Sequence, residues 1–236
     1  MNPKLKEIYD RCWTQLGGEK NQDLQWVLKR RAKSITRKSF FEQVVWAIWV
    51  SGKGRKQADS FLDRAADIGF PYPYDFNHVA SWTEPRFRRF VEKLHGHPVP
   101  EGAYKRWLAI RSIAQRLCKY SSEKAFRAAL FGGKVRSADL DHNDANALAA
   151  MRLPWIGETN ASFIIRNMGG EDTKDDRWLK EFRKYNRISH DELNKRLRRS
   201  SIQPGVFDGV LWAYCEKFIR RVNGFTEHFD RVFNSR

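Results

Sequence analysis

The sequence predicts an all-α fold. Apolar residues recur three and four positions apart along most of the chain, which is the spacing of an amphipathic helix. An alternation of period two, which would indicate strands, is not sustained in any segment. Clusters of glycine and proline interrupt the apolar faces, so we expect a series of helices joined by tight turns.

The first half of the chain contains several predicted helices. Their apolar faces are Phe40, Phe41, Val44, Val45, Ile48 and Trp49, then Ala58, Phe61, Leu62, Ala65 and Ile68, then Trp107, Ile110, Ile113, Ala114 and Leu117. Breaks are expected at 51–54, at 69–73 and at 95–102, where turn residues gather.

The second half continues the pattern. Several possible N-caps between Asp139 and Asn143 predict a short helix running to Met151. A Leu-Pro-Trp-Ile-Gly turn follows, and the next helix is expected from about Glu158 to Gly169. Another helix should begin near Arg177. The last predicted face is Phe207, Val210, Leu211, Tyr214, Phe218 and Val222.

Composition restricts the partners. The 236 residues carry 44 Lys and Arg against 28 Asp and Glu, a formal charge of +16. The electrostatic field of so basic a chain attracts polyanions, so nucleic acid is the leading partner. The alternatives are an anionic membrane surface and a charge that serves only solubility. No apolar run is long enough to span a bilayer, and the first residues lack a signal-peptide core. We expect a cytoplasmic protein, associated with the nucleoid in a bacterium.

Metal centres and disulfides are not predicted. The three cysteines, Cys12, Cys118 and Cys215, are far apart in the sequence, which argues against a disulfide framework. They cannot form a four-cysteine iron–sulfur cluster. His95 and His97 have no cysteine pair near them, so we interpret them as loop residues and expect no zinc site.

Residues 153–179 carry the chemistry. A glycine-containing turn between two short helices exposes backbone N–H groups that can hold a phosphate, although an ordinary αα turn has the same pattern. The acidic residues that follow are unusual in so basic a chain. A carboxylate there could stabilise the cationic sugar formed when a glycosidic bond breaks. Asp175 or Asp176 could equally cap the next helix, and the two roles are compatible.

These motifs resemble the helix-hairpin-helix DNA glycosylase superfamily, which includes the endonuclease III-like and 3-methyladenine-glycosylase branches. The segment Leu153–Ala161 matches the hairpin, and Lys174–Leu179 matches the segment with the catalytic aspartate. The resemblance implies that Asp176 is that aspartate, with Asp175 as the alternative if the register slips. Residues 40–52 and 205–212 resemble the first barrel helix and the closing helix.

The resemblance also implies the binding residues. Lys53 would fill the space of the flipped base. The expected DNA-binding set is Lys53, Arg55, Trp155, Ile156, Gly157, Glu158, Thr159, Lys174 and Arg177. Trp46, Trp49, Trp178 and Trp212 are expected to line the base pocket, although helical stripes bury most tryptophans as core.

Two departures qualify the resemblance. Thr159 stands where bifunctional members have a nucleophilic lysine, so we expect a monofunctional enzyme that leaves an abasic site, unless Lys53 or Lys174 substitutes. Trp155 replaces the first hairpin glycine, which would distort the turn or place the indole against DNA.

The expected architecture has two helical lobes with duplex DNA in the cleft between them. A six-helix barrel lobe would comprise residues 40–170, and residues 1–39 with 171–236 would form the other lobe. We expect a monomer without an iron–sulfur cluster, and a structural monovalent cation at the hairpin is left open. The alternatives are a catalytically inactive DNA-binding protein and an RNA-binding or membrane-surface protein that uses charge alone.

Overall fold

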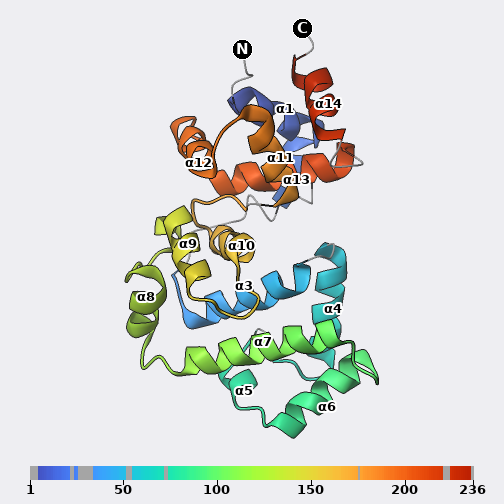
Figure 1. Ribbon diagram of the computed structural model, residues 1–236, viewed down its shortest axis with the longest axis vertical. Helices are drawn as coiled ribbons and strands as arrows, with labels where there is room; N and C mark the ends of the chain where they lie inside the picture. The colour runs from blue at the N-terminus through green and yellow to red at the C-terminus, as the bar shows by residue number, and fades with distance from the viewer. Residues whose placement is uncertain are drawn as a thin grey trace.

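The fold is all-helical, as the sequence predicted (Figure 1). A computed structural model describes residues 5–21, 24–25, 34–51, 55–71, 74–174, 176–219 and 224–234. Within these ranges no strand forms, and β-type pairing is limited to the isolated bridges Ser34–Arg136 and Asp141–Glu171.

The described residues form α-helices and a few shorter helical segments, in chain order. They are α1 (Leu5–Gln15), η1 (Gly18–Lys20), α3 (Arg37–Val50), α4 (Arg55–Asp67), α5 (Phe76–Ala80), α6 (Glu84–His95), α7 (Glu101–Cys118), α8 (Glu123–Phe131), η2 (Ser137–Asp139), α9 (His142–Ala150), α10 (Glu158–Met168), α11 (Arg177–Asn186), α12 (His190–Arg199), α13 (Pro204–Phe218), α14 (Phe225–Phe229) and η4 (Asp230–Asn234).

The buried apolar side chains form two separate clusters. The first runs from Ile35 to Met168 and includes side chains from α3 to α10. The second combines residues 8–24 with residues 178–229, from α1 and from α11 to α14. Figure 1 shows the same two groups of helices one above the other, with both ends of the chain in the upper group. We call them the first lobe and the second lobe.

The predicted apolar faces are buried. All six residues of the face on α3 are in the first core, as are all five on α7. On α13 the face from Phe207 to Tyr214 is in the second core, Phe218 packs against it, and Val222 lies outside the described residues. A repeat of three and four positions therefore identified the core sides of these helices.

The elements around the lobe junction have clear start and stop signals. Helix α9 begins with a capping box in which Asp141 accepts from the backbone of Asp144 and the Asp144 side chain accepts in return. Helix α10 ends at Gly169, whose φ of 103° is readily adopted only by glycine. Helix α13 begins with Pro204, which suits a first helical position because it lacks an N–H.

Candidate functional site

Two buried side chains hold the turn between α9 and α10. Leu153 and Ile156 both lie in the first core, and the N–H of Ile156 donates to the Leu153 carbonyl at 3.0 Å. Ile156, which the resemblance assigns to DNA binding, thus contributes a core side chain to the turn. Pro154, Trp155 and Gly157 are exposed around this anchor.

Trp155 has an unusual backbone conformation. Its φ is 65°, in the left-handed region where a side chain costs of order 1–3 kcal/mol. The Asn160 side chain donates to the Trp155 carbonyl at 2.7 Å, and the Arg106 guanidinium lies 5.0 Å from the indole centre. The side chain is 40% exposed. The turn therefore holds a large aromatic ring at the surface, where the resembling pattern has glycine.

A pocket of about 790 Å³ opens at the start of α10. Its lining comes from the end of α3, the second half of α9 and the first turn of α10, namely Ser51, Asn146, Ala149, Ala150, Gly157, Glu158, Thr159 and Asn160. The N-cap residue of α10 is Gly157, which has no side chain to cap the helix. The first N–H groups of a helix carry partial positive charge and can hold a phosphate oxygen, while the Glu158 carboxylate in the same lining repels one.

Asp176 lies at the N-cap of α11. Its Oδ1 accepts hydrogen bonds from the backbone N–H groups of Trp178 at 3.0 Å and Leu179 at 3.2 Å. Burial raises the pKa of Asp176, the nearby Asp208 carboxylate raises it further, and Lys174 opposes both effects. The cap uses Oδ1, so Oδ2 is left for another partner.

A buried ion pair joins the two lobes next to Asp176. Asp208 on α13 pairs with Arg166 on α10, and their exposed fractions are 1% and 4%. Asp208 also accepts from the backbone N–H of Lys174 at 3.2 Å. Removing one partner of a buried ion pair typically costs about 3–5 kcal/mol, so this pair firmly fixes the segment between α10 and α11.

The amine of Lys174 lies against an aromatic ring. Its Nζ is 4.3 Å from the centre of Phe163, which is on α10. Burial lowers the pKa of Lys174, and the Arg166 charge lowers it further, while the Asp176 and Asp208 carboxylates act in the opposite direction.

The four tryptophans expected in the pocket occupy different environments. Trp49 and Trp178 are 1% and 3% exposed and belong to the first and second cores, so neither offers a stacking face to a base in this structure. Trp212 is half-buried against the second core. Trp46 is half-buried on α3 and stacks on Phe163, with ring centres 5.1 Å apart.

The remaining predicted residues fall into two groups. Gly157, Glu158 and Thr159 line the pocket. Lys174 and Asp176 precede α11, and the exposed Arg177 at its start pairs with Glu216. Along α10, Arg166 follows Glu158 by eight residues, or about 12 Å along the helix axis. Arg166 is linked to the second group through Asp208, which accepts from the backbone N–H of Lys174.

Three of the predicted site residues have side chains outside the described part of the structure. Lys53 and Asp175 lie outside the described residues, and so does the side chain of Arg55, with which α4 begins.

Arg106 and Asp208 belong to the site although sequence reasoning did not select them. Arg106 donates to the carbonyls of Ile48 at 3.2 Å and Ser51 at 2.9 Å, so it ties the end of α3 to the indole of Trp155. Its position on α7 gives no sequence signal. Asp208 does have one, because it interrupts the apolar face around Phe207.

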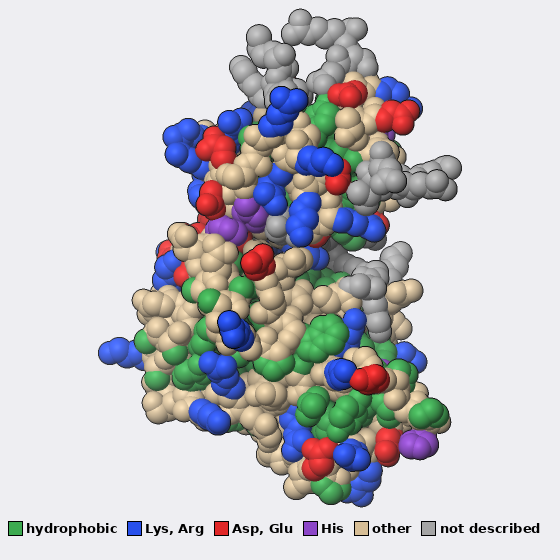
Figure 2. Space-filling view, viewed as in Figure 1, with side chains coloured by type: hydrophobic (Ala, Val, Ile, Leu, Met, Phe, Trp, Pro, Cys, Tyr) green, Lys and Arg blue, Asp and Glu red, His purple; other side chains and the backbone are tan. Residues whose placement is uncertain are grey.

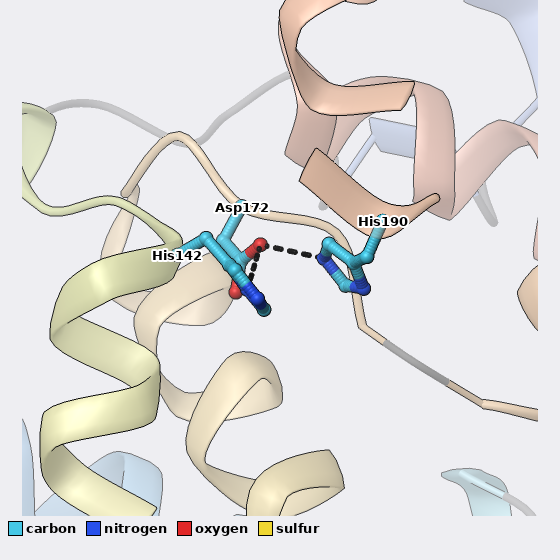
Figure 3. Close-up of side chains that lie close together, drawn as sticks. All are labelled: His142, Asp172 and His190. Carbon is cyan, nitrogen blue, oxygen red and sulfur yellow. Dashed lines mark hydrogen bonds and ion pairs between the residues drawn. The ribbon is translucent and has the colours of Figure 1, made fainter. Parts of the chain in front are cut away.

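A second polar cluster connects the lobes (Figure 3). His142 begins α9, His190 begins α12, and Asp172 lies in the segment between α10 and α11. The Asp172 Oδ1 is 3.0 Å from His190 Nε2 and 3.3 Å from His142 Nδ1. Burial opposes the charge on Asp172, but hydrogen bonds from His142 and His190 outweigh it and lower the pKa of Asp172 to about 2.

Asp172 contacts the two histidines differently, through a hydrogen bond with His190 and an ion-pair contact with His142. The two imidazole rings are stacked, with centres 4.1 Å apart and planes at 20°. An imidazole nitrogen binds a metal ion in the plane of its ring, about 2.0–2.1 Å away. Two nearly parallel rings cannot both aim at one ion, so His142, Asp172 and His190 would have to rearrange before they could hold a metal.

The surface is basic over both lobes. Figure 2 shows Lys and Arg side chains scattered over this face, densest on the upper lobe, with acidic side chains among them. Such a surface supports encounter with a polyanion without specifying where it is bound. In the described part of the chain, no helix combines the length and apolar composition that a membrane span requires.

Comparison with known proteins identifies no relative of this chain. No family model, no curated protein and no solved structure matches this chain. The function is therefore inferred from the residues of the site and from the motif in residues 153–179.

Proposed function

We propose that this protein is a DNA glycosylase, which flips a damaged or modified base out of duplex DNA and hydrolyses its N-glycosidic bond. The observation that carries the proposal is the combination of a helix N-terminus that has glycine at its N-cap and opens on a pocket with Asp176, a carboxylate of raised pKa on the segment that follows the same helix. Either feature alone is common. Together they supply a grip on the DNA backbone and a charge for the reacting sugar.

The pocket at α10 would hold the phosphate. A phosphate oxygen can accept from the N–H groups of the first helical turn without any contact to a base, so this grip is independent of sequence. Gly157 at the N-cap leaves space for close approach, since a Cβ built there meets no atom within 4 Å. The exposed indole of Trp155 lies beside the same turn and offers a face for stacking.

Asp176 would act on the sugar. As the base departs with the bonding electrons, positive charge develops on the sugar, and an ionised carboxylate stabilises it. The Oδ2 of Asp176 accepts the proton of the water that adds to C1′. Proton transfer of this kind typically contributes about 10²- to 10⁴-fold to a rate. Thr159 provides no amine in the hairpin, so release of the base is hydrolytic.

The class of base is set by the aromatic side chains that would stack on it once it has left the duplex. A flipped base is held by aromatic faces and by hydrogen bonds to its edge. Trp46 and Trp155 are the partly exposed aromatic side chains near the two groups of site residues. Aromatic walls favour a cationic alkylated purine, because a π face attracts positive charge. The substrate panel should also contain oxidised, deaminated, mismatched and hypermodified phage-type bases.

The test compares two helix caps. Asp176→Asn keeps the cap acceptor at α11, because asparagine caps helices as well as aspartate does, but it removes the charge. Asp75→Asn makes the same change at the N-cap of α5, where Asp75 accepts from Asn77 and His78. On labelled duplexes that each contain one altered base, we expect Asp176→Asn to slow base release at least about 100-fold. Asp75→Asn should match the wild type.

Two results would count against the proposal. If Asp176→Asn releases base as fast as Asp75→Asn, the carboxylate has no catalytic role. If the wild type binds the panel tightly and releases nothing, the protein is the inactive DNA-binding alternative.

A further inference from the structure

Helix α11 has one apolar side and one cationic side. The apolar side packs into the second core, where Trp178 and Phe182 are buried. The other side carries exposed basic side chains at Lys180, Lys184 and Arg187. Spacings of four and three residues place these three cations in one stripe along the helix. The apolar side therefore fixes the helix in the second lobe, and the cationic side faces solvent.

The two cations at the end of this stripe form no ion pair. The exposed Arg177 at the start of the helix pairs with Glu216. Lys184 and Arg187 have no such contact among the described residues. Like charges three or four residues apart on a helix repel each other. A bound polyanion would relieve that repulsion.

The backbone of Arg187 is in a conformation that favours glycine. Arg187 is the C-cap of α11, with φ of 53° and ψ of 45°. Glycine is the usual residue where a helix ends in the left-handed region, because it has no Cβ. A guanidinium therefore stands where local stability favours a residue without a side chain. Such strain is typical of positions that are used in binding or catalysis.

The stripe extends from the proposed reacting group. Asp176 is the N-cap of α11, and Lys184 and Arg187 follow it by eight and eleven residues. At 1.5 Å per residue, they lie about 12 and 16 Å from Asp176 along the helix axis.

We propose that the cationic side of α11 binds the phosphate backbone of one flank of the duplex, and that Lys184 and Arg187 make the contacts. The inference rests on the proposed function, which brings the altered nucleotide to Asp176. A DNA strand has one phosphate per about 3.4 Å of duplex axis, so a duplex that follows α11 brings Arg187 level with a phosphate about five base pairs away. These contacts position the duplex and read no base.

An anionic membrane surface is the competing partner for a basic helix. A helix that lies on a membrane inserts an apolar face among the lipids. The apolar side of α11 is not available for this, because Trp178 and Phe182 belong to the second core. A phosphate backbone requires only the charges, so nucleic acid fits this surface better.

The experiment measures how the Kd for a duplex depends on salt concentration. The duplex contains one tetrahydrofuran abasic analogue, which provides a site without any reaction. In the double variant Lys184→Gln/Arg187→Gln, the slope of log Kd against log salt concentration should fall by about 1.8, because each phosphate contact contributes about 0.9. At about 0.1 M salt its Kd should rise at least about tenfold.

The matched control is Arg116→Gln/Lys119→Gln. It also removes one Arg and one Lys that are exposed, three residues apart and at the end of a helix, with Lys119 as the C-cap of α7. Figure 1 shows α7 in the lower group of helices and α11 in the upper group. The control should keep the wild-type slope, although its net charge is that of the double variant.

Two further measurements separate a phosphate contact from a structural role. Shortening the flank that follows α11 to about two base pairs should lower the wild-type slope and leave the slope of Lys184→Gln/Arg187→Gln unchanged. Arg187→Gly removes the backbone strain with the charge, so it should weaken duplex binding without lowering Tm. An arginine with only a structural role would show no loss of affinity.

The outcomes separate this inference from the proposed function. A slope that equals the wild-type slope in Lys184→Gln/Arg187→Gln overturns the inference, as does an equal fall in the control. If the double variant loses binding only to vesicles of phosphatidylcholine and phosphatidylserine, the surface belongs to a membrane contact. If base release is measured while the slope is unchanged, the glycosylase stands and the role of α11 falls. If the slope falls but no base is ever released, α11 binds DNA and the glycosylase falls.

Discussion

At the level of single residues, two neighbouring carboxylates have different surroundings. Asp208 is fully buried, paired with Arg166 and bonded to the backbone of Lys174, so its role is to fix the junction. Asp176 is more accessible and uses Oδ1 for its helix cap. When one of two neighbouring carboxylates is buried and paired and the other is more accessible, the first commonly has a structural role and the second a chemical one. In the proposed function the chemistry therefore falls to Asp176.

The raised pKa of Asp176 predicts the pH dependence of base release. Burial and the Asp208 charge favour the protonated form, so a higher pH is needed to ionise Asp176. Because the ionised form stabilises the cationic sugar, the single-turnover rate should rise with pH. Its midpoint should lie above the ordinary aspartate value of about 4.

The control for this profile is Asp176→Asn, whose residual rate should lack that rise. A wild-type rate already at its plateau at about pH 4 would contradict the assignment.

At the level of elements, the helices could be predicted and the contacts between them could not. Glycine and proline clusters located the breaks before α4 and after α6, and the apolar repeat identified the buried faces of α3 and α7. Arg166–Asp208 and His142–Asp172–His190 join residues that are distant in sequence, where periodicity carries no information. The signal that was available is the charge of Arg166 and Asp208 within otherwise apolar runs.

The position of α10 predicts opposite effects for two glycines. At Gly157 a Cβ meets nothing within 4 Å and φ is −88°, so Gly157→Ala should leave Tm unchanged. The added methyl group would stand in the pocket that we propose for a phosphate, so duplex affinity should fall about tenfold or more, which is about 1.4 kcal/mol.

Gly170→Ala should lower Tm and leave the affinity of the folded protein for duplex DNA unchanged. A Cβ there would lie 2.7 Å from Ile165 Cγ2 and 3.0 Å from Leu140 Cβ, and such overpacking typically costs about 1–3 kcal/mol. Denaturant unfolding and DNA titration of both variants test the pair. A Gly157→Ala protein that binds DNA normally would remove the phosphate role from α10.

At the level of the whole molecule, the two lobes are joined by two buried polar contacts. One is the ion pair of Arg166 with Asp208, and the other is the cluster of His142, Asp172 and His190. Each spans from the first lobe to the second, and both lie along the segment that connects α10 with α11. The relative position of the pocket and Asp176 therefore depends on these contacts as well as on apolar packing.

The histidine cluster predicts a pH-dependent stability. The pKa of Asp172 is lowered to about 2, so its charge should contribute about 2–3 kcal/mol of stability at neutral pH. That stability is present above the unfolded value of about 4 and is lost as pH falls towards 2. Asp172→Asn should therefore be destabilised by this amount at pH 7, and the difference from wild type should shrink in acid.

Asp191→Asn is the matched control for this prediction. Asp191 also faces His142, with Oδ1 3.6 Å from Nε2, but its side chain is 81% exposed. Its substitution should change the free energy of unfolding by less than about 0.5 kcal/mol. Equal effects of the two substitutions in urea titrations would show that burial of Asp172 does not strengthen the contact.

The most direct test of the proposed function is the detection of a free base in solution. Wild-type protein is incubated with a panel of duplexes that carry alkylated, oxidised, deaminated, mismatched or hypermodified bases, and released bases are identified by mass spectrometry. This readout is independent of any later strand cleavage. We expect at least one base to appear in solution as its strand becomes alkali-labile. Tight binding to every duplex with no free base from any of them would contradict it.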